Sequence, residues 1–172
     1  METLQDTTVG DATEAIWYFG YGSNMSRAIF LERRTMRPLA ARRGYLEDYR
    51  LCFNIPVGPG ERGVANLEAL VGARTWGVLY LLTPSEFDRL DRTEGVPAGL
   101  YRRIAVDIAI DGDQRLRAFT YQSSMISDGR KPSARYLGLL LDGAQQFGLP
   151  AGYVDFLRSF PLASDERAAA ER

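Results

Sequence analysis

The segment IWYFGYGSNM, residues 16–25, sets the beginning of the fold. β-Branched and aromatic side chains dominate its first six residues, which is the composition of a strand. The tripeptide Gly22–Asn24 follows at once and is typical of a tight turn. Ser23 or Asn24 is then placed to cap a short helix over Ser26–Arg34. The segment therefore predicts a strand, a sharp turn and a helix start in direct succession.

The turn in this segment is also a candidate binding site, with Tyr21, Gly22, Ser23 and Asn24 as its members. A strand end, a glycine and a helix start bring backbone N–H groups together, and such a nest suits a carboxylate or a phosphate. The alternative is that Gly22 only permits the turn, because glycine adopts conformations that other residues avoid. No complete phosphate-loop motif is present, so the sequence alone leaves both interpretations open.

Further along, strand and helix patterns alternate and are separated by turn residues. Thr83-Pro84-Ser85-Glu86 combines an N-cap, a proline at the first helical position and a capping-box glutamate. Acidic turns are expected at residues 47–48 and 111–113. Clustered strands joined mainly by turns favour an α+β fold with a mixed, mostly antiparallel, barrel-like sheet. The expected strands are residues 40–46, 49–55, 64–70, 75–82, 104–110 and 116–121, and the expected helices are residues 84–95, 133–147 and 151–160.

The length of 172 residues suits one domain, and neither an internal repeat nor a dividing linker interrupts it. We expect that domain to cover residues 16–162. The polar, acidic residues 1–15 lack the basic and apolar order of a secretory signal and are expected to be disordered. The small and charged residues 163–172 are expected to form a flexible tail.

Composition removes several classes of function. The 21 basic and 22 acidic residues give a net charge of −1, which offers no support for nucleic-acid binding. The apolar stretches, such as Val78–Leu82, fall short of the ~20 residues of a membrane span. Cys52 is the single cysteine, so a reducing, cytoplasmic compartment is expected. With no histidine, Ser-His and Cys-His nucleophile pairs and imidazole zinc sites are excluded.

Glu94 is the candidate acid/base, because proton transfer in this chain must fall to a perturbed Glu, Asp, Tyr or Lys. It is expected in the last turn of the helix that begins at Pro84. The helix macrodipole is negative at that end, which disfavours an ionised carboxylate and raises its pKa. A base that must later act as an acid benefits from such a shift. The alternative is an ordinary solvated glutamate.

Tyrosines form a third group of candidates, with Tyr101, Tyr121 and Tyr136 near expected element ends. Aromatic side chains at the ends of sheets commonly fill a core or line a pocket, and the sequence does not separate these roles. Cys52 lies in an apolar strand and is expected to be a buried, small hydrophobic residue.

Together these residues resemble the γ-glutamylcyclotransferase family. The resemblance covers about Trp17 to Phe160 and is strongest where the Tyr21–Asn24 turn, the later Glu-Gly-Val at Glu94 and the later tyrosines occur in this order. The matching segments are Tyr21-Gly22-Ser23-Asn24, Trp76-Gly77-Val78, Leu90-Asp91, Glu94-Gly95-Val96, Gly99-Leu100-Tyr101 and Pro132-Ser133-Ala134-Arg135-Tyr136.

The resemblance implies a small mixed barrel flanked by helices and a site for the γ-glutamyl head of a small-molecule substrate. The turn, Tyr21, Gly22, Ser23 and Asn24, would hold that head, Glu94 would be the acid/base, and Tyr101 and Tyr136 would line the pocket. No cofactor, metal, nucleic acid or membrane is implied, and a monomer or homodimer is expected. Glutathione-specific relatives carry leucine where Asn24 stands, so the chain resembles the general γ-glutamyl-amino-acid branch. Gly20 stands where the animal enzymes have alanine.

The implied reaction cyclises a γ-glutamyl amide to 5-oxoproline and releases an amine. The same reaction on a γ-glutamylated biosynthetic intermediate or carrier protein is one alternative, and a non-catalytic ligand-binding barrel is another. The leaving amine stays open, because the loops at residues 57–62 and 123–131 are expected to shape its pocket.

Overall fold

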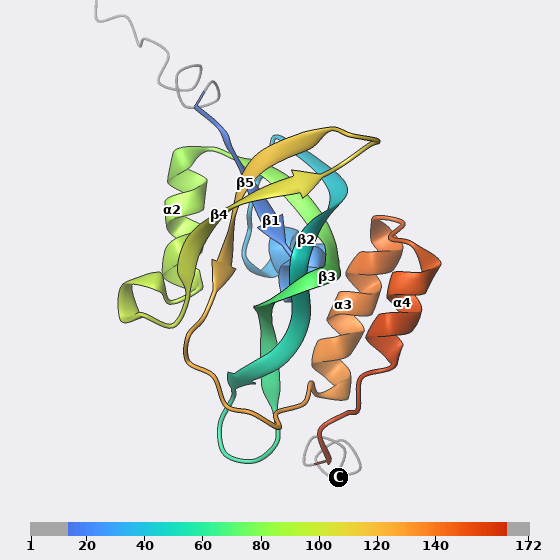
Figure 1. The fold of residues 1–172 in the computed structure, drawn as a ribbon. Coiled ribbons are helices and arrows are strands. Elements are labelled where there is room, and N and C mark those ends of the chain that lie inside the picture. The colour runs from blue at the N-terminus through green and yellow to red at the C-terminus, as the bar shows by residue number, and fades with distance from the viewer. Residues whose placement is uncertain (1–13, 165–172) are drawn as a thin grey trace, which may run out of the picture.

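The computed structural model describes residues 14–164, in which five strands close a barrel in the order β1-β3-β2-β4-β5 (Figure 1). Every neighbouring pair is antiparallel except β1 and β5, which are parallel where Tyr18 meets Phe119. The expected α+β fold with a mixed, mostly antiparallel barrel is therefore confirmed. The predictions for residues 1–13 and 165–172 lie outside the described residues. The strands are β1 (Ile16–Gly20), β2 (Ala40–Pro56), β3 (Gly63–Leu82), β4 (Arg102–Ala109) and β5 (Arg115–Gln122).

β2 and β3 are each one long strand, whereas the sequence predicted two short strands in each region. The register of the β2–β3 pair changes between Glu47 and Tyr49. At Asp48, between them, φ is 64°, and its carboxylate accepts a hydrogen bond from the Gly72 N–H at 2.9 Å. A bulge of this kind bends a strand without ending it. The acidic pair predicted as a turn therefore lies inside a continuous strand, where Asp48 stands opposite the extra residues 70–73 of β3.

Helices and short helical turns cover the outside of the barrel. Figure 1 shows α2 on one side, with α3 and α4 packed together on another. Among the described residues, no helix is long and apolar enough to cross a membrane. The helical elements are η1 (Ser23–Met25), η2 (Ala28–Arg33), α2 (Pro84–Thr93), η3 (Val96–Ala98), α3 (Ala134–Gln146) and α4 (Ala151–Arg158).

Two of the predicted helix caps are present. The Thr83 Oγ1 accepts from the Glu86 N–H at 3.3 Å at the start of α2, and the Ser133 Oγ accepts from the Tyr136 N–H at 3.0 Å at the start of α3. The predicted helix over residues 26–34 is wrong in type: η2 is a π-helical segment that has no side-chain cap. Instead of capping it, the Asn24 side chain turns to other partners, described below.

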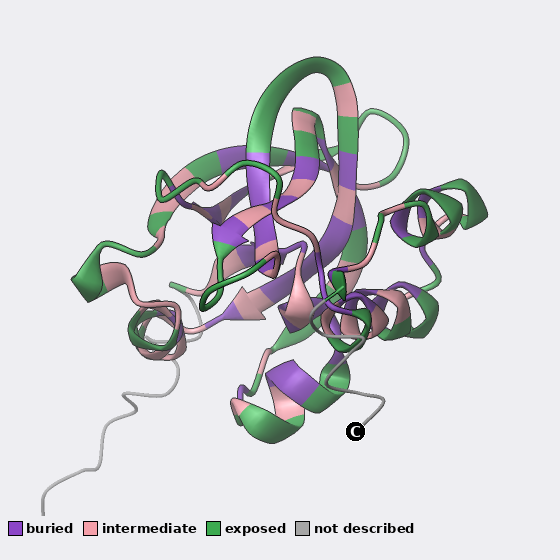
Figure 2. Cartoon of the chain, turned by 90° about the horizontal axis from the view of Figure 1, so that it is seen from below, coloured by how far each residue is buried: buried purple, intermediate pink, exposed green. Residues whose placement is uncertain are grey.

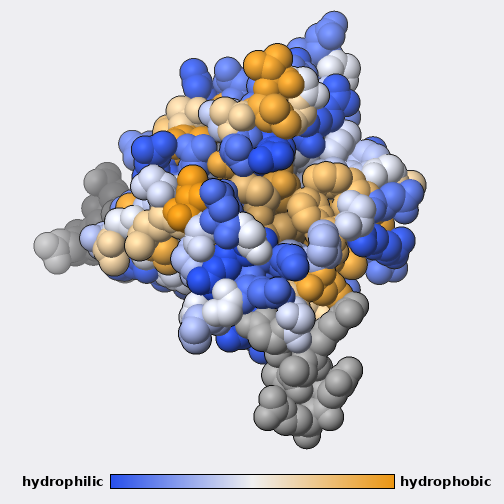
Figure 3. All heavy atoms as spheres, turned by 60° about the horizontal axis from the view of Figure 1, so that its bottom comes forward, coloured by the Kyte–Doolittle hydropathy of each residue, from blue (hydrophilic) through white to orange (hydrophobic). Residues whose placement is uncertain are grey.

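Core side chains pack against the turn that follows β1 and hold it in place. The rings of Phe30 and Tyr80 stack with centroids 4.0 Å apart, and the Tyr80 hydroxyl donates to the backbone oxygen of Asn24 at 2.8 Å. Figure 2 shows buried residues along the barrel strands and on one side of the helices. On the face seen in Figure 3, hydrophobic groups at the surface are separated by hydrophilic ones. The turn thus rests on the packed interior, while its other side remains open for a site.

Candidate active site

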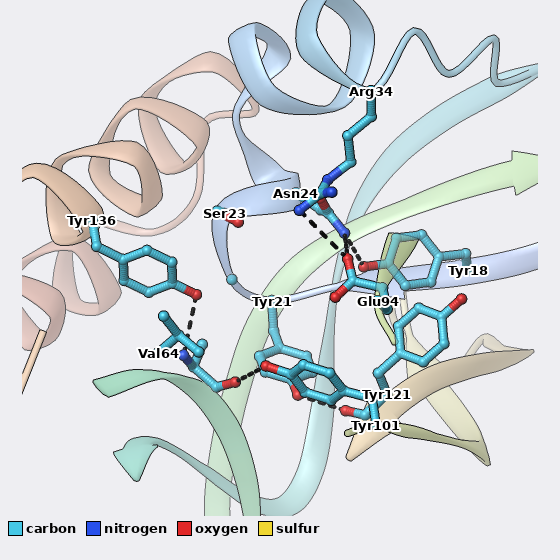
Figure 4. A pocket seen from close by; sticks show the side chains of 12 residues that line it. Tyr18, Tyr21, Ser23, Asn24, Arg34, Val64, Glu94, Tyr101, Tyr121 and Tyr136 are labelled. Atoms are coloured by element: carbon cyan, nitrogen blue, oxygen red, sulfur yellow. Dashed lines mark hydrogen bonds and ion pairs between the residues drawn. The ribbon is translucent and has the colours of Figure 1, made fainter. Parts of the chain in front are cut away.

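A cavity of about 210 Å³ lies where β1 turns into η1 (Figure 4). All seven site residues predicted from the sequence line it, although they come from four separate stretches of chain. These residues are Tyr21, Gly22, Ser23, Asn24, Glu94, Tyr101 and Tyr136. Five further residues complete its wall, namely Tyr18, Arg34, Val64, Ala65 and Tyr121. The fold therefore gathers the predicted residues at one place, while the role of each remains a prediction.

Glu94 is the C-cap residue of α2, and the chain leaves the helix through Gly95, whose φ of 73° favours glycine. Its side chain is only 14% exposed. The Glu94 Oε1 accepts a hydrogen bond from the Asn24 Nδ2 at 2.9 Å and lies 3.7 Å from the Arg34 Nη2. The carboxylate is thus held by one neutral donor and one cation.

Burial raises the pKa of the Glu94 carboxyl above its ordinary value, and it is the largest influence on that group. The Arg34 charge and the Asn24 hydrogen bond act in the opposite direction, because they stabilise the ionised form. The sequence predicted a raised pKa from the helix macrodipole. The direction agrees, and the main cause in the structure is burial.

Both polar atoms of the Asn24 side chain form hydrogen bonds with neighbouring residues. Its Nδ2 also donates to the Tyr18 hydroxyl at 2.8 Å, and its Oδ1 accepts from the Arg34 Nε at 2.7 Å. An amide group carries two N–H donors, so both are used, one on Glu94 and one on Tyr18. The orientation of the amide is therefore fixed, and Figure 4 shows it between Glu94 and Arg34.

Tyr101 and Tyr136 hold the opposite wall through the backbone of Ala65. The Tyr101 hydroxyl donates to the Ala65 oxygen at 2.9 Å, and the Ala65 N–H donates to the Tyr136 hydroxyl at 3.1 Å. Burial raises the pKa of Tyr136 to about 12, so its phenol stays protonated at neutral pH. Both rings consequently present neutral, fixed hydroxyl groups at the cavity edge.

Gly22 packs closely against the opposite wall of the cavity. A Cβ on this residue would lie 3.0 Å from the Tyr136 hydroxyl and 3.1 Å from the Ala65 Cβ. Its backbone, with φ of −109° and ψ of −139°, lies outside the regions that other residues commonly adopt. The turn conformation and the close packing both favour glycine here, so the two interpretations raised from the sequence stay open.

Tyr21 and Tyr121 brace the floor of the cavity. The Tyr21 hydroxyl donates to the Tyr121 backbone oxygen at 2.5 Å, and the Tyr121 hydroxyl donates to the Asp91 Oδ1 at 2.6 Å. Arg103 Nε donates to the same Asp91 oxygen at 2.8 Å. Asp91 is thus committed to a structural network and is not free for acid/base work.

Arg34 lines the cavity and contacts both Asn24 and Glu94, yet it is not among the residues predicted from the sequence. It is the C-cap residue of the π-helical segment η2, and its guanidinium reaches Asn24 and Glu94. Many other arginines in the chain give no local signal that singles it out. Within residues 14–164, no group of three or more His, Cys, Asp or Glu side chains is arranged to hold a metal ion.

Comparisons with known proteins agree with this geometry. Residues 74–157 match the model of the AIG2-like family. The γ-glutamylcyclotransferase of Bos taurus is 30% identical over 151 residues, which cover 85% of this chain and 79% of the relative. The chain belongs to the γ-glutamylcyclotransferase family. It is therefore an enzyme of γ-glutamylcyclotransferase type, similar to its curated relatives.

Other members of the γ-glutamylcyclotransferase family are similar over most of the chain. The γ-glutamyl cyclotransferase gliK of Claviceps purpurea is 33% identical, with 80% of this chain and 67% of the relative covered. A solved structure of a γ-glutamyl cyclotransferase superposes with a TM-score of 0.77 at 25% identity, covering 88% of this chain and 90% of the other. The similarity to known members thus extends well beyond the residues of the site.

Proposed function

We propose that this chain cyclises γ-glutamyl amides to 5-oxoproline and releases an amine, with Glu94 as the acid/base. The observation that carries the proposal is the buried Glu94 carboxylate, hydrogen-bonded to Asn24 at 2.9 Å within the cavity formed by the 21–24 turn. Membership of the γ-glutamylcyclotransferase family supports the reaction class. The substrate brings its own nucleophile, so no histidine or cofactor is needed.

The reaction begins at the substrate α-ammonium, which gives a proton to the Glu94 carboxylate. The freed amine attacks the γ-carbonyl carbon and forms the C–N bond of a five-membered ring. Glu94 then returns this proton to the leaving nitrogen as the original amide C–N bond breaks. The ring nitrogen still carries a second proton from the ammonium group, which it gives up and the released amine takes up. The products are 5-oxoproline and the amine as its ammonium ion, and the carboxylate is restored. Holding the γ-glutamyl chain curled places the amine in a near-attack geometry on the γ-carbonyl carbon.

The raised pKa of Glu94 suits both halves of this cycle. A carboxyl at its ordinary pKa of about 4.3 is a weak base, and its protonated form is scarce at pH 7. Burial moves the carboxyl toward the operating pH, where one group can accept and return a proton. Arg34 and Asn24 limit the shift, so that the ionised form remains available to begin the reaction.

The remaining wall residues are proposed to hold the γ-glutamyl head. Tyr21, Gly22, Ser23 and Asn24 supply the turn at which the substrate α-carboxylate or the γ-carbonyl oxygen would be bound. Tyr101 and Tyr136 would close the pocket around the curled chain. Five of the twelve residues that line the cavity of about 210 Å³ are tyrosines, and a space of this size favours a compact substrate conformation.

The setting of the enzyme is also proposed. Cys52 lies half-buried in β2 with its thiol pKa raised by burial to about 11, which fits a small hydrophobic residue better than a reactive one. We infer a reducing, cytoplasmic compartment and a monomer or homodimer.

Incubation with γ-glutamyl-alanine and with glutathione tests the function directly, with 5-oxoproline followed by mass spectrometry. The wild type should release 5-oxoproline from the dipeptide, and Glu94→Gln should not, while still binding it. Glu68→Gln is the matched control, because that carboxylate is exposed and pairs with Arg50 outside the cavity. Release that persists in Glu94→Gln, or no release from any γ-glutamyl amide, would overturn the proposal.

A further inference from the structure

A second cavity, of about 300 Å³, adjoins the first. The two share Ser23, Arg34, Val64 and Tyr136 in their walls. In the proposed reaction the leaving nitrogen lies beside Glu94, which lines the first cavity and not the second. The part of the substrate beyond that nitrogen would then extend along the common wall toward the second cavity.

The second cavity is lined by arginines. Arg33 closes η2, Arg62 precedes β3 and Arg135 lies in the first turn of α3, so three separate elements direct a cation to the same space. Arg34 adds a fourth. None of the twelve lining residues is an aspartate or a glutamate. Arg33 and Arg135 therefore give this wall positive charge, even after the charge of Arg34 is set against its neighbour Glu94.

The chemistry of this wall selects among leaving groups. A guanidinium binds a carboxylate with two parallel hydrogen bonds, and charge-assisted bonds of this kind are stronger than neutral ones. A neutral amine would meet these cations with no complementary charge. A leaving amino acid with one carboxylate could pair with only some of these arginines. An acidic amino acid offers two carboxylates, which could pair with arginines from separate elements of the wall.

We propose that the second cavity is a leaving-group subsite for a dianion, and that the preferred substrate is a γ-glutamyl conjugate of an acidic amino acid. The inference rests on the proposed cyclotransfer and adds to it the chemical class of the released amine. Arg33 and Arg135 are its specificity residues, with Arg62 adding to the positive wall. Val57 and Leu139 supply apolar contact for the short side chain of the leaving amino acid.

The test compares γ-glutamyl-glutamate with γ-glutamyl-glutamine, which have the same shape and differ by one negative charge. The wild-type kcat/KM should be about tenfold or more higher for the glutamate conjugate than for the glutamine conjugate, mainly because KM is lower. Added salt should reduce this ratio, because the arginines are accessible to solvent. Arg33→Gln and Arg135→Gln should each bring the ratio of the two kcat/KM values closer to one.

Arg117→Gln is the matched control, because Arg117 is exposed on β5, pairs with Asp107 at 3.5 Å and lines neither cavity. It removes one positive charge from the molecule and should leave the ratio unchanged. Equal kcat/KM for the two dipeptides in the wild type, or an equal narrowing in Arg117→Gln, would overturn the subsite.

A binding measurement separates failure of this inference from failure of the proposed function. Calorimetric titration of folded Glu94→Gln with each dipeptide should give tighter binding of γ-glutamyl-glutamate, and Arg135→Gln in that background should reduce the difference. Release of 5-oxoproline without discrimination in rate or binding would refute the subsite alone. Discrimination in binding without release by the wild type would refute the cyclotransfer and keep the anionic subsite.

Discussion

The Asn24 side chain makes three hydrogen bonds, and each joins it to a different part of the fold. It donates to Glu94 beyond α2 and to Tyr18 in β1, and it accepts from Arg34 after η2. A carboxylate of the same shape could accept from Arg34 but could not donate to Glu94. The amide is therefore the one group of this size that satisfies all three partners.

Asn24→Asp should consequently lower kcat/KM by about 100-fold, the loss associated with displacing a reacting group by about 1 Å. The added negative charge should also raise the pKa of Glu94 further. Glu94 must be ionised to take the first proton, so activity falls as the pH drops through this pKa. The acidic limb of the kcat/KM profile should therefore move to higher pH than in the wild type. Initial rates of 5-oxoproline release across a pH series measure both effects.

Gln145→Glu is the control for this change, because it adds one negative charge at an exposed position of α3, away from the cavity. Its pH profile should follow that of the wild type. An unshifted acidic limb in Asn24→Asp would show that Asn24 does not act on Glu94.

At the scale of elements, α3 contains two glycines in opposite surroundings. Gly143 packs against the site turn, and Gly138 does not. A Cβ on Gly143 would lie 2.5 Å from the Met25 Cβ in η1, whereas a Cβ on Gly138 would meet nothing within 4 Å. Gly138→Ala should stabilise the protein by about 0.5–1 kcal/mol through helix propensity. Gly143→Ala should destabilise it by about 1–3 kcal/mol through overpacking. Urea unfolding of the two variants measures both values.

The same pair reports on the site, because Met25 directly follows Asn24. Gly143→Ala should reduce turnover at temperatures where it is still folded, since α3 then displaces η1. Gly138→Ala should retain the wild-type rate. Equal stability changes in the two variants would mean that α3 does not press on η1.

Elements with local signals were predictable, and elements set by distant contacts were not. Thr83 and Ser133 cap their helices through neighbours three residues away, so the sequence contains the whole interaction. The bulge at Asp48 depends on a hydrogen bond to Gly72, which lies 24 residues later. The acidic pair Glu47-Asp48 has the local sequence of a turn, but the pairing of β2 with β3 keeps the strand continuous.

The candidate site shows the same division. Local patterns mark Glu94 and the 21–24 turn as candidates, and the family resemblance is what implies a role for them. Arg34 has no such local signal, and the fold brings it beside Asn24. The arginine-lined cavity is also a product of folding, because Arg33, Arg62 and Arg135 are far apart in the chain.

At the scale of the whole molecule, the cavity has no element of its own. Its wall takes residues from the β1–η1 turn, the end of η2, β3, the end of α2, the segment before β4, β5 and α3. The barrel is closed by the parallel contact of β1 with β5, and β1 is also the strand that leads into the site turn. Loss of any one of these elements from the fold should therefore destroy the cavity.

This arrangement predicts that activity and global structure are lost together in urea. Trp17 in β1 and Trp76 in β3 are the two tryptophans of the chain, so their fluorescence reports on the barrel. The midpoint of fluorescence, that of far-UV circular dichroism and that of 5-oxoproline release should coincide, as expected for a single cooperative transition. Activity lost at a lower urea concentration than fluorescence would instead show that α3 or η2 leaves the barrel first. In that case the site would be a locally unstable layer on a stable barrel, and Gly143→Ala should widen the gap between the two midpoints.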